Sequence, residues 1–146
     1  MQQVTRQIVL ESGKLLRAAD LASPEGFWER AAMLRAEERV LVELAVRGGR
    51  SHRQIAALVG GTPGSITRKL QRLSRRLSDP LVLALLHPNC TLEPQERQLG
   101  VEHFLCGLSA KELATKHQIP AVRVRRVLHS LQLWHRGARG KTNGSY

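Results

Sequence analysis

The sequence is poor in aromatic residues and contains no long apolar run, and each shortage excludes a class of protein. Proteins that bind single strands or read RNA sequence stack bases on aromatic side chains, but aromatics make up only 3% of this chain. No apolar run approaches the roughly 20 residues that a membrane span needs. The first residues also lack the residue order of a secretion signal. We therefore expect a cytoplasmic protein with no membrane partner.

Residues suited to metal binding or catalysis are scarce as well. Cys90 and Cys106 show no C-x-x-C spacing, and the six histidines show no H-x-x-x-H spacing. The twelve acidic residues form no carboxylate cluster of the kind that holds a metal ion. Ser51 and Ser109 are better explained as helix caps than as nucleophiles. The sequence therefore predicts that the protein is not an enzyme and has no catalytic residue, metal site or cofactor.

Basic residues are abundant, and their excess is confined to two segments. The chain of 146 residues has a net charge of +11. Residues 62–78 contain five basic side chains, residues 120–141 contain six, and neither segment contains an acidic residue. The remaining chain balances at twelve basic and twelve acidic residues. Such a concentration of positive charge favours a polyanionic partner, and the shortage of aromatics favours double-stranded DNA over single strands.

An internal repeat places these two basic segments at corresponding positions. A shift of 58 residues aligns 34–77 with 92–135 without a gap. Apolar residues recur at spacings of three and four in both copies, which predicts helices throughout. The ten identical pairs are Leu34/Leu92, Glu38/Glu96, Arg39/Arg97, Leu41/Leu99, Gly49/Gly107, Ser51/Ser109, Ala56/Ala114, Arg68/Arg126, Leu70/Leu128 and Leu73/Leu131.

Each copy is predicted to form three helices. The first helix spans about 35–47 in one copy and begins near Pro94 in the other, and Gly49 and Gly107 mark the ends. The second helix opens on a capping box, Ser51 to Gln54 in one copy and Ser109 to Glu112 in the other. The third helix follows after a short turn, so the pattern is that of a helix-turn-helix.

The third helix is the candidate DNA-binding element, because its basic face lies opposite its apolar stripe. In the first copy Thr62 is expected to cap this helix, and Pro63 fits its first turn. The stripe consists of Ile66, Leu70, Leu73 and Leu77. A helix held in this way presents its basic face outward, as a recognition helix does in a major groove. The candidate DNA-contacting residues are Ser65, Arg68, Lys69, Gln71, Arg72, Arg75 and Arg76 in the first copy and Arg123, Arg125, Arg126, His129 and Arg136 in the second, with Arg139 and Lys141 as further phosphate contacts.

These residues resemble region four of the sigma-seventy family of RNA polymerase specificity factors and, more distantly, the output domains of response regulators. In the first copy the resemblance rests on Glu38-Arg39, Ser51, Ile55-Ala56, Gly60, Gly64-Ser65-Ile66, Arg68 and Leu70. In the second copy it rests on Pro94, Glu96-Arg97, Gly107-Leu108-Ser109, Leu113-Ala114, Ile119, Val124, Arg126 and Leu128. It implies a transcriptional regulator that binds duplex DNA through two tandem modules.

The chain departs from the family pattern at three turn positions and at its N-terminal end. Gly61 stands where such sequences place an aliphatic residue, and Gln118 and Pro120 replace the turn glycine and the cap serine. Residues 1–30 are too short for the promoter-melting domain of a working sigma factor. The resemblance therefore implies DNA binding without initiation.

The expected architecture is all-α, with tandem trihelical helix-turn-helix modules after an N-terminal helical extension. The expected parts are the extension (1–30), the first module (31–79), a linker helix (80–90), the second module (91–137) and a flexible basic tail (138–146). Two other functions stay open: a non-catalytic module that docks on RNA polymerase or another protein, and the DNA-binding part of a transposase or recombinase. The apolar positions Val4, Ile8, Leu15 and Leu16, with Phe27-Trp28, are expected to form an amphipathic helix pair that either packs on the first module or joins two copies in a homodimer.

Overall fold

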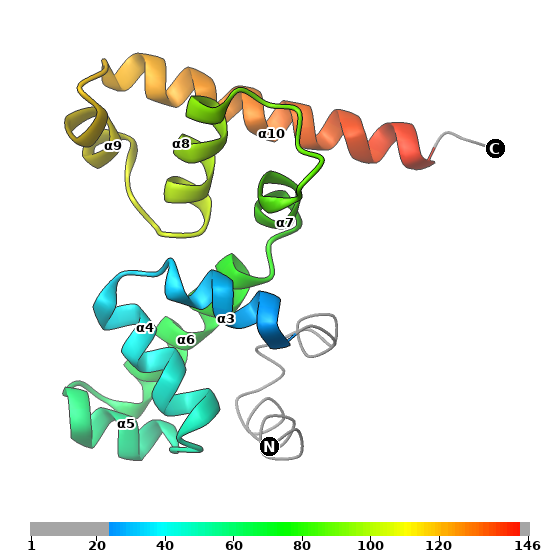
Figure 1. The fold of residues 1–146 in the computed structure, drawn as a ribbon. Helices are drawn as coiled ribbons and strands as arrows, with labels where there is room; N and C mark the ends of the chain where they lie inside the picture. The colour runs from blue at the N-terminus through cyan, green and yellow to red at the C-terminus, as the bar shows by residue number, and fades with distance from the viewer. Residues whose placement is uncertain (1–23, 144–146) are drawn as a thin grey trace. The chain divides into compact units, whose positions relative to one another are not determined.

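The computed structural model describes the backbone of residues 24–143 and the side chains of residues 26–138. All regular secondary structure in these ranges is helical, which confirms the all-α fold class. The chain divides between Ser78 and Asp79 into two compact units, which we call the first unit and the second unit (Figure 1). The apolar positions between 4 and 16, and the homodimer expected through them, lie outside the described residues.

The first unit is built around one amphipathic helix, α6. Its elements are α3 (Pro24–Ala32), α4 (Ala36–Val42), a π-helical turn η1 (Glu43–Arg47), α5 (His52–Val59) and α6 (Pro63–Leu77). Helix α6 packs against α3, α4 and α5. The predicted stripe is buried, since Ile66, Leu70, Leu73 and Leu77 expose only 0–5% of their surface. Each such side chain contributes about 1.5–3 kcal/mol on burial, so the stripe fixes which side of α6 faces solvent.

Helix α3 is anchored to the first unit by three different contacts. Phe27 is buried, and the guanidinium of Arg47 lies 3.8 Å above the centre of the Trp28 ring. Arg30 is buried too, and its Nε donates a hydrogen bond of 2.8 Å to the carbonyl oxygen of Leu77 at the end of α6. Because the last carbonyls of a helix lack partners within the helix, this bond satisfies a group that would otherwise be costly to bury.

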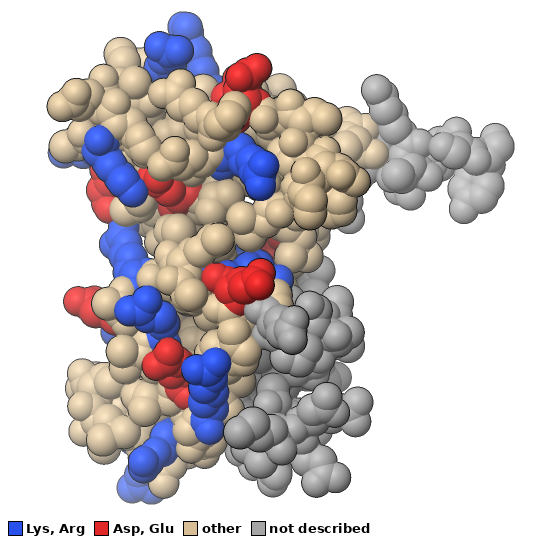
Figure 2. Space-filling view, viewed as in Figure 1, with Lys and Arg blue, Asp and Glu red and all other residues tan. Residues whose placement is uncertain are grey.

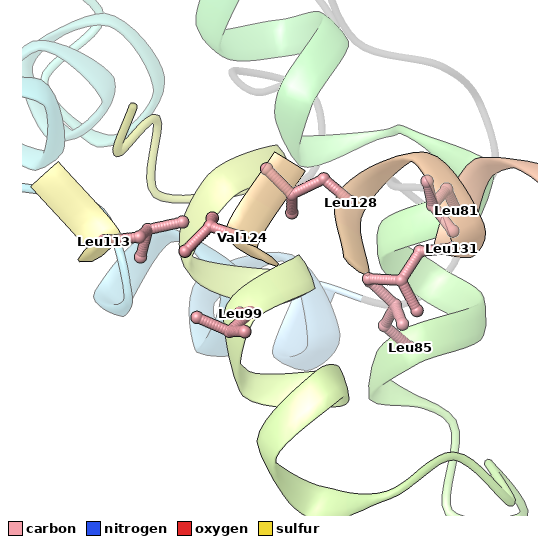
Figure 3. Packing of buried hydrophobic residues seen from close by; sticks show 7 residues of the cluster. All are labelled: Leu81, Leu85, Leu99, Leu113, Val124, Leu128 and Leu131. Atoms are coloured by element: carbon pink, nitrogen blue, oxygen red, sulfur yellow. The ribbon is translucent and has the colours of Figure 1, made fainter. Parts of the chain in front are cut away.

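The second unit consists of four helices around a leucine-rich core. They are α7 (Pro80–Leu86), α8 (Pro94–Phe104), α9 (Ala110–His117) and α10 (Ala121–Asn143). Helix α10 contacts the other three. Figure 3 shows the core, in which side chains from all four helices point toward one another. Its buried members are Leu81, Leu85, Leu99, Leu113, Val124, Leu128 and Leu131.

Helix α7 occupies most of the segment predicted as a linker, and it is part of the second unit. Leu81 and Leu85 expose 5% and 0% of their surface and belong to the same core as Leu99 and Leu131. Asp79 caps the helix, because its carboxylate accepts the Leu81 N–H at 2.9 Å. The sequence pattern could not assign α7 to a unit, since an apolar segment of seven residues does not reveal its partner.

Local backbone features recur at the 58-residue offset. Gly49 and Gly107 both have positive φ angles, 59° and 77°, at the end of the first helix of each copy. The following N–H groups, of Arg50 and Leu108, reach back six residues to carbonyl oxygens at 3.1 Å and 3.0 Å. Each bond closes the chain back over the helix end, and glycine is favoured at the turn because it adopts a left-handed conformation without strain. The predicted punctuation of both helices by glycine is thus confirmed.

Helix α10 extends into the segment predicted as a basic tail. The backbone of α10 continues as a helix through Asn143 and so includes most of 138–146. An isolated glycine such as Gly137 or Gly140 costs a helix only about 1 kcal/mol, and the segment contains no proline. The side chains of Arg139 and Lys141 lie outside the described part of the chain.

We predict that the second unit depends on its leucine core in a position-specific way. Leu131→Ala removes a side chain that is 98% buried and should lower the free energy of unfolding by about 2–5 kcal/mol. Leu133→Ala, two residues further along the same helix, removes a side chain that is 52% exposed and should change it by less than about 0.5 kcal/mol. Urea unfolding of both variants measures the difference, and equal losses would contradict this core.

Candidate nucleic-acid interface

The N-terminal end of α6 is shaped by a reciprocal cap. Thr62 Oγ1 accepts the Ser65 N–H at 3.1 Å, and Ser65 Oγ accepts the Thr62 N–H at 3.1 Å. Pro63 occupies the first helical position, where an N–H group has no partner in the helix. The predicted cap is thus confirmed, with Ser65 completing it. The Ser65 hydroxyl also donates to the Thr62 carbonyl at 2.9 Å, so this predicted DNA contact is already engaged in the turn.

The turn before α6 requires its two glycines. Gly60 and Gly61 have φ angles of 93° and 91°, a conformation that other residues rarely adopt. A methyl group at position 61 would also lie 2.9 Å from Ser65 Oγ and would disturb the cap. This contact gives a physical reason why glycine stands where the sigma-like pattern has an aliphatic residue.

A hydrogen bond between α5 and α6 holds the two helices together near this turn. The Thr67 hydroxyl donates to the carbonyl oxygen of Pro63 at 2.9 Å. His52 Nδ1 lies 2.6 Å from the same hydroxyl oxygen. The pair joins the first turn of α5 to α6 and was not evident from the sequence, since 15 residues separate the partners.

The outward face of α6 carries most of its predicted DNA contacts. Arg68, Lys69, Arg72 and Arg75 are exposed, and Gln71 is partly exposed. No acidic residue occurs on α6 to neutralise them. Because the stripe of the helix is buried on the other side, these side chains share the solvent-facing surface of one rigid helix. This is the arrangement that contact with a polyanionic groove requires.

Arg76 does not join that surface. Its two guanidinium nitrogens donate to the two carboxylate oxygens of Glu38 on α4, at 2.7 Å and 2.8 Å. Both side chains are about three-quarters buried. A bidentate pair with this geometry joins α6 to α4, so the structure gives Arg76 a role in holding the helix. The sequence did not reveal this partner, which lies 38 residues away.

The outward face of α10 is basic but less uniform. Arg123, Arg125, Arg126, His129 and Arg136 are all exposed. Two large apolar side chains are exposed on the same helix, Val122 at 55% and Leu133 at 52%. At the 58-residue offset they correspond to Gly64 and Arg75 of α6. The third helices of the two copies, α6 and α10, therefore bury similar residues but present different surfaces to solvent.

The start of α10 also differs from the start of α6. Gln118 adopts the left-handed conformation, with φ of 55°, where the first unit has Gly60. Pro120 stands in the place of the capping Thr62 and has no side-chain hydroxyl to offer. The Arg123 and Val124 N–H groups are instead bonded to the Pro120 carbonyl at 3.0 Å and 3.1 Å. The turn is preserved, but without the reciprocal cap.

Basic side chains do not gather into a single area on the face drawn in Figure 2. There they are interspersed with acidic ones in both units. The candidate interface is therefore defined helix by helix, by the exposed basic residues of α6 and α10.

A cluster of polar side chains joins α8 and α9 in the second unit, and the sequence did not predict it. Glu102 on α8 is buried, and its carboxylate accepts from Gln98 Nε2 at 2.9 Å and contacts His117 Nε2 at 3.0 Å and Lys116 Nζ at 3.2 Å. Burial raises the pKa of Glu102, but the hydrogen bonds from His117, Gln98 and Lys116 outweigh it and leave the pKa below its usual value of 4.5. An ionised carboxylate with three partners joins α8 to α9 and is not poised to exchange protons near neutral pH.

No group of three or more His, Cys, Asp or Glu side chains within the described ranges is arranged to hold a metal ion. Comparisons with protein-family models, curated proteins and solved structures find no match for this chain. No helix between residues 24 and 143 is both long and apolar enough to cross a bilayer.

We predict that neighbouring arginines of α6 have separable roles. Arg76→Ala removes the partner of Glu38, whose side chain is about three-quarters buried, and should lower the free energy of unfolding by about 1 kcal/mol, whereas Arg75→Ala, at an exposed position, should leave it unchanged. Urea unfolding of Arg76→Ala, Glu38→Ala and the double variant measures the coupling. A coupling energy of zero would show that the bidentate pair does not stabilise the unit.

We predict that Glu102 stabilises the second unit only when it is ionised. Its pKa is lower in the folded state than in the unfolded chain, so its contribution is complete above pH 4.5 and is lost as the pH falls through the folded value. Glu102→Gln should cost about 1–3 kcal/mol at pH 7. This difference in the free energy of unfolding should shrink in acid, at a pH below the folded pKa of Glu102. Urea unfolding of the variant and the parent at pH 7 and in acid measures it. A difference that stays constant with pH would contradict this role.

Proposed function

We propose that this protein binds double-stranded DNA and acts as a transcriptional regulator, with α6 as its groove-reading helix. The observation that carries the proposal is the outward face of α6, where Arg68, Lys69, Arg72 and Arg75 are exposed on a helix without acidic residues. The buried stripe, the Arg76–Glu38 pair and the His52–Thr67 bond fix the orientation of this face. Rigid presentation reduces the entropy lost on binding.

Several features of the chain support this proposal. The α5–turn–α6 arrangement corresponds to a helix-turn-helix in which the second helix enters the groove. The resemblance to region four of sigma-seventy factors agrees with a role at promoters. The proposal involves no catalytic step and no cofactor. In this reading Arg68, Gln71 and Arg72 contact base edges or phosphates, while Lys69 and Arg75 neutralise phosphates.

A second candidate function concerns α10. Val122 and Leu133 are large apolar side chains that expose more than half of their surface among basic residues. Such a face suits contact with an acidic protein surface, including RNA polymerase, as well as contact with phosphates. In the proposed regulator α6 reads DNA, and α10 either adds phosphate contacts through Arg123, Arg125, Arg126 and Arg136 or contacts a protein.

We predict tight duplex binding that is steeply dependent on salt. Engagement of one phosphate by each of the four exposed basic residues of α6 would give a slope of about −3.6 in a plot of log affinity against log salt, and contacts from α10 would steepen it. Fluorescence anisotropy with random-sequence duplexes and single strands, titrated in salt, measures both preference and slope. A preference for single strands or a flat salt response would reject the proposal.

The same assay assigns the binding to α6 by comparison of two variants. Arg68→Ala/Arg72→Ala should weaken duplex binding by about tenfold or more. The control, Arg39→Ala/Arg97→Ala, removes the same formal charge from α4 and α8 and should bind within about twofold of the parent. If both variants lose affinity equally, general charge and not the face of α6 accounts for binding.

A further inference from the structure

The guanidinium of Arg68 lies beside the bare backbone of Gly64. A methyl group placed on Gly64 would stand 3.7 Å from Arg68 Nη1 and 4.0 Å from Thr62 Oγ1. Long side chains on a helix point back toward its N-terminus and cover the residue four positions earlier. The Arg68 side chain follows this rule, and the missing side chain at position 64 leaves room for its head group over the first turn of α6.

The space at position 64 is limited. A distance of 3.7 Å is ordinary van der Waals contact, so alanine would just fill the gap. A branched side chain would add two methyl groups beyond Cβ, on the surface where the guanidinium lies. The head group would then have to leave the first turn, although the arginine itself would remain on the helix.

The second unit has such a branched residue at the corresponding position. Val122 lies four residues before Arg126, as Gly64 lies four residues before Arg68, and 55% of its surface is exposed. Arg126 is identical to Arg68 in the repeat, but a valine side chain stands at position 122 where the first unit has Gly64. The two arginines therefore have different surroundings although they occupy the same position.

We propose that Gly64 is a positioning residue, which seats Arg68 over the first turn of α6 so that this arginine reads base edges and sets sequence specificity. The inference rests on the proposed DNA-binding function. The N-terminal turn of a recognition helix approaches the bases most closely. An arginine directed there can form the bidentate contact to guanine, whereas an arginine displaced to the side reaches only phosphates.

Helix stability and arginine placement respond differently to substitution at this position. Gly64 lies in the first turn of α6 and its φ is not positive, so alanine and valine fit this backbone and reduce the conformational freedom of the unfolded chain. Both Gly64→Ala and Gly64→Val should therefore melt at or above the temperature of the parent. A loss of binding in Gly64→Val would therefore not result from unfolding. Gly64→Ala is the matched control, because it removes the glycine but leaves the Arg68 head group in place.

The test uses one duplex enriched by the parent protein from a random pool and a scrambled duplex of the same composition. Gly64→Ala should bind the enriched duplex as the parent does. Gly64→Val and Arg68→Ala should each lose about tenfold on the enriched duplex and less on the scrambled one. The double variant Gly64→Val/Arg68→Ala should bind no more weakly than Arg68→Ala alone, because both changes remove the same contact.

The outcomes separate the two proposals. If Arg68→Ala loses affinity but Gly64→Val binds like the parent, the positioning role is wrong and the DNA-binding function stands. Additive losses in the double variant would also reject the positioning role. If the parent binds no duplex, or Arg68→Ala binds like the parent, the α6 interface itself is wrong and the inference about Gly64 is rejected with it.

Discussion

The apolar stripe of α6, formed by Ile66, Leu70, Leu73 and Leu77, packs against the helices around it, and the placement of every charged residue on α6 follows from that burial. Turning α6 about its axis would expose four large side chains at a cost of about 1.5–3 kcal/mol each and would bury guanidinium groups without partners. Both penalties oppose this rotation of α6. The basic face is therefore fixed by packing on the opposite side of the helix.

Local bonds then determine how the end of α6 is presented. The Thr62–Ser65 cap and the two left-handed glycines set the turn, and the His52–Thr67 bond keeps α5 beside it. In a small helical unit no sheet is available to hold a helix end in place. Caps and short hydrogen bonds between neighbouring helices supply that constraint, and each would typically contribute about 1 kcal/mol.

The sequence could predict those features that depend on residues close together in the chain. Helical periodicity identified the buried stripe, and caps at Ser51, Thr62 and Ser109 were evident because cap and partner are three residues apart. Features that depend on which helices meet could not be predicted, such as the Arg76–Glu38 pair and the position of α7 in the second unit. Arg75 and Arg76 look alike in the sequence, yet one is exposed and the other is held by a distant carboxylate. Which basic residues are exposed could therefore be seen only in the structure.

The comparison of α6 with α10 shows that the buried and the exposed positions of a helix are constrained separately. Their inward positions match closely: Ile66 with Val124, Leu70 with Leu128 and Leu73 with Leu131 are all buried. Their outward positions diverge, and Gly64 and Arg75 give way to the exposed Val122 and Leu133. Packing does not determine these solvent-facing residues, which can therefore differ between the two helices. Under the proposed function, α6 is suited to enter a groove, because its exposed face is uniformly basic and its first turn has no side chain at Gly64. Helix α10, with its mixed face, is suited to a shallower contact in which apolar area contributes alongside charge.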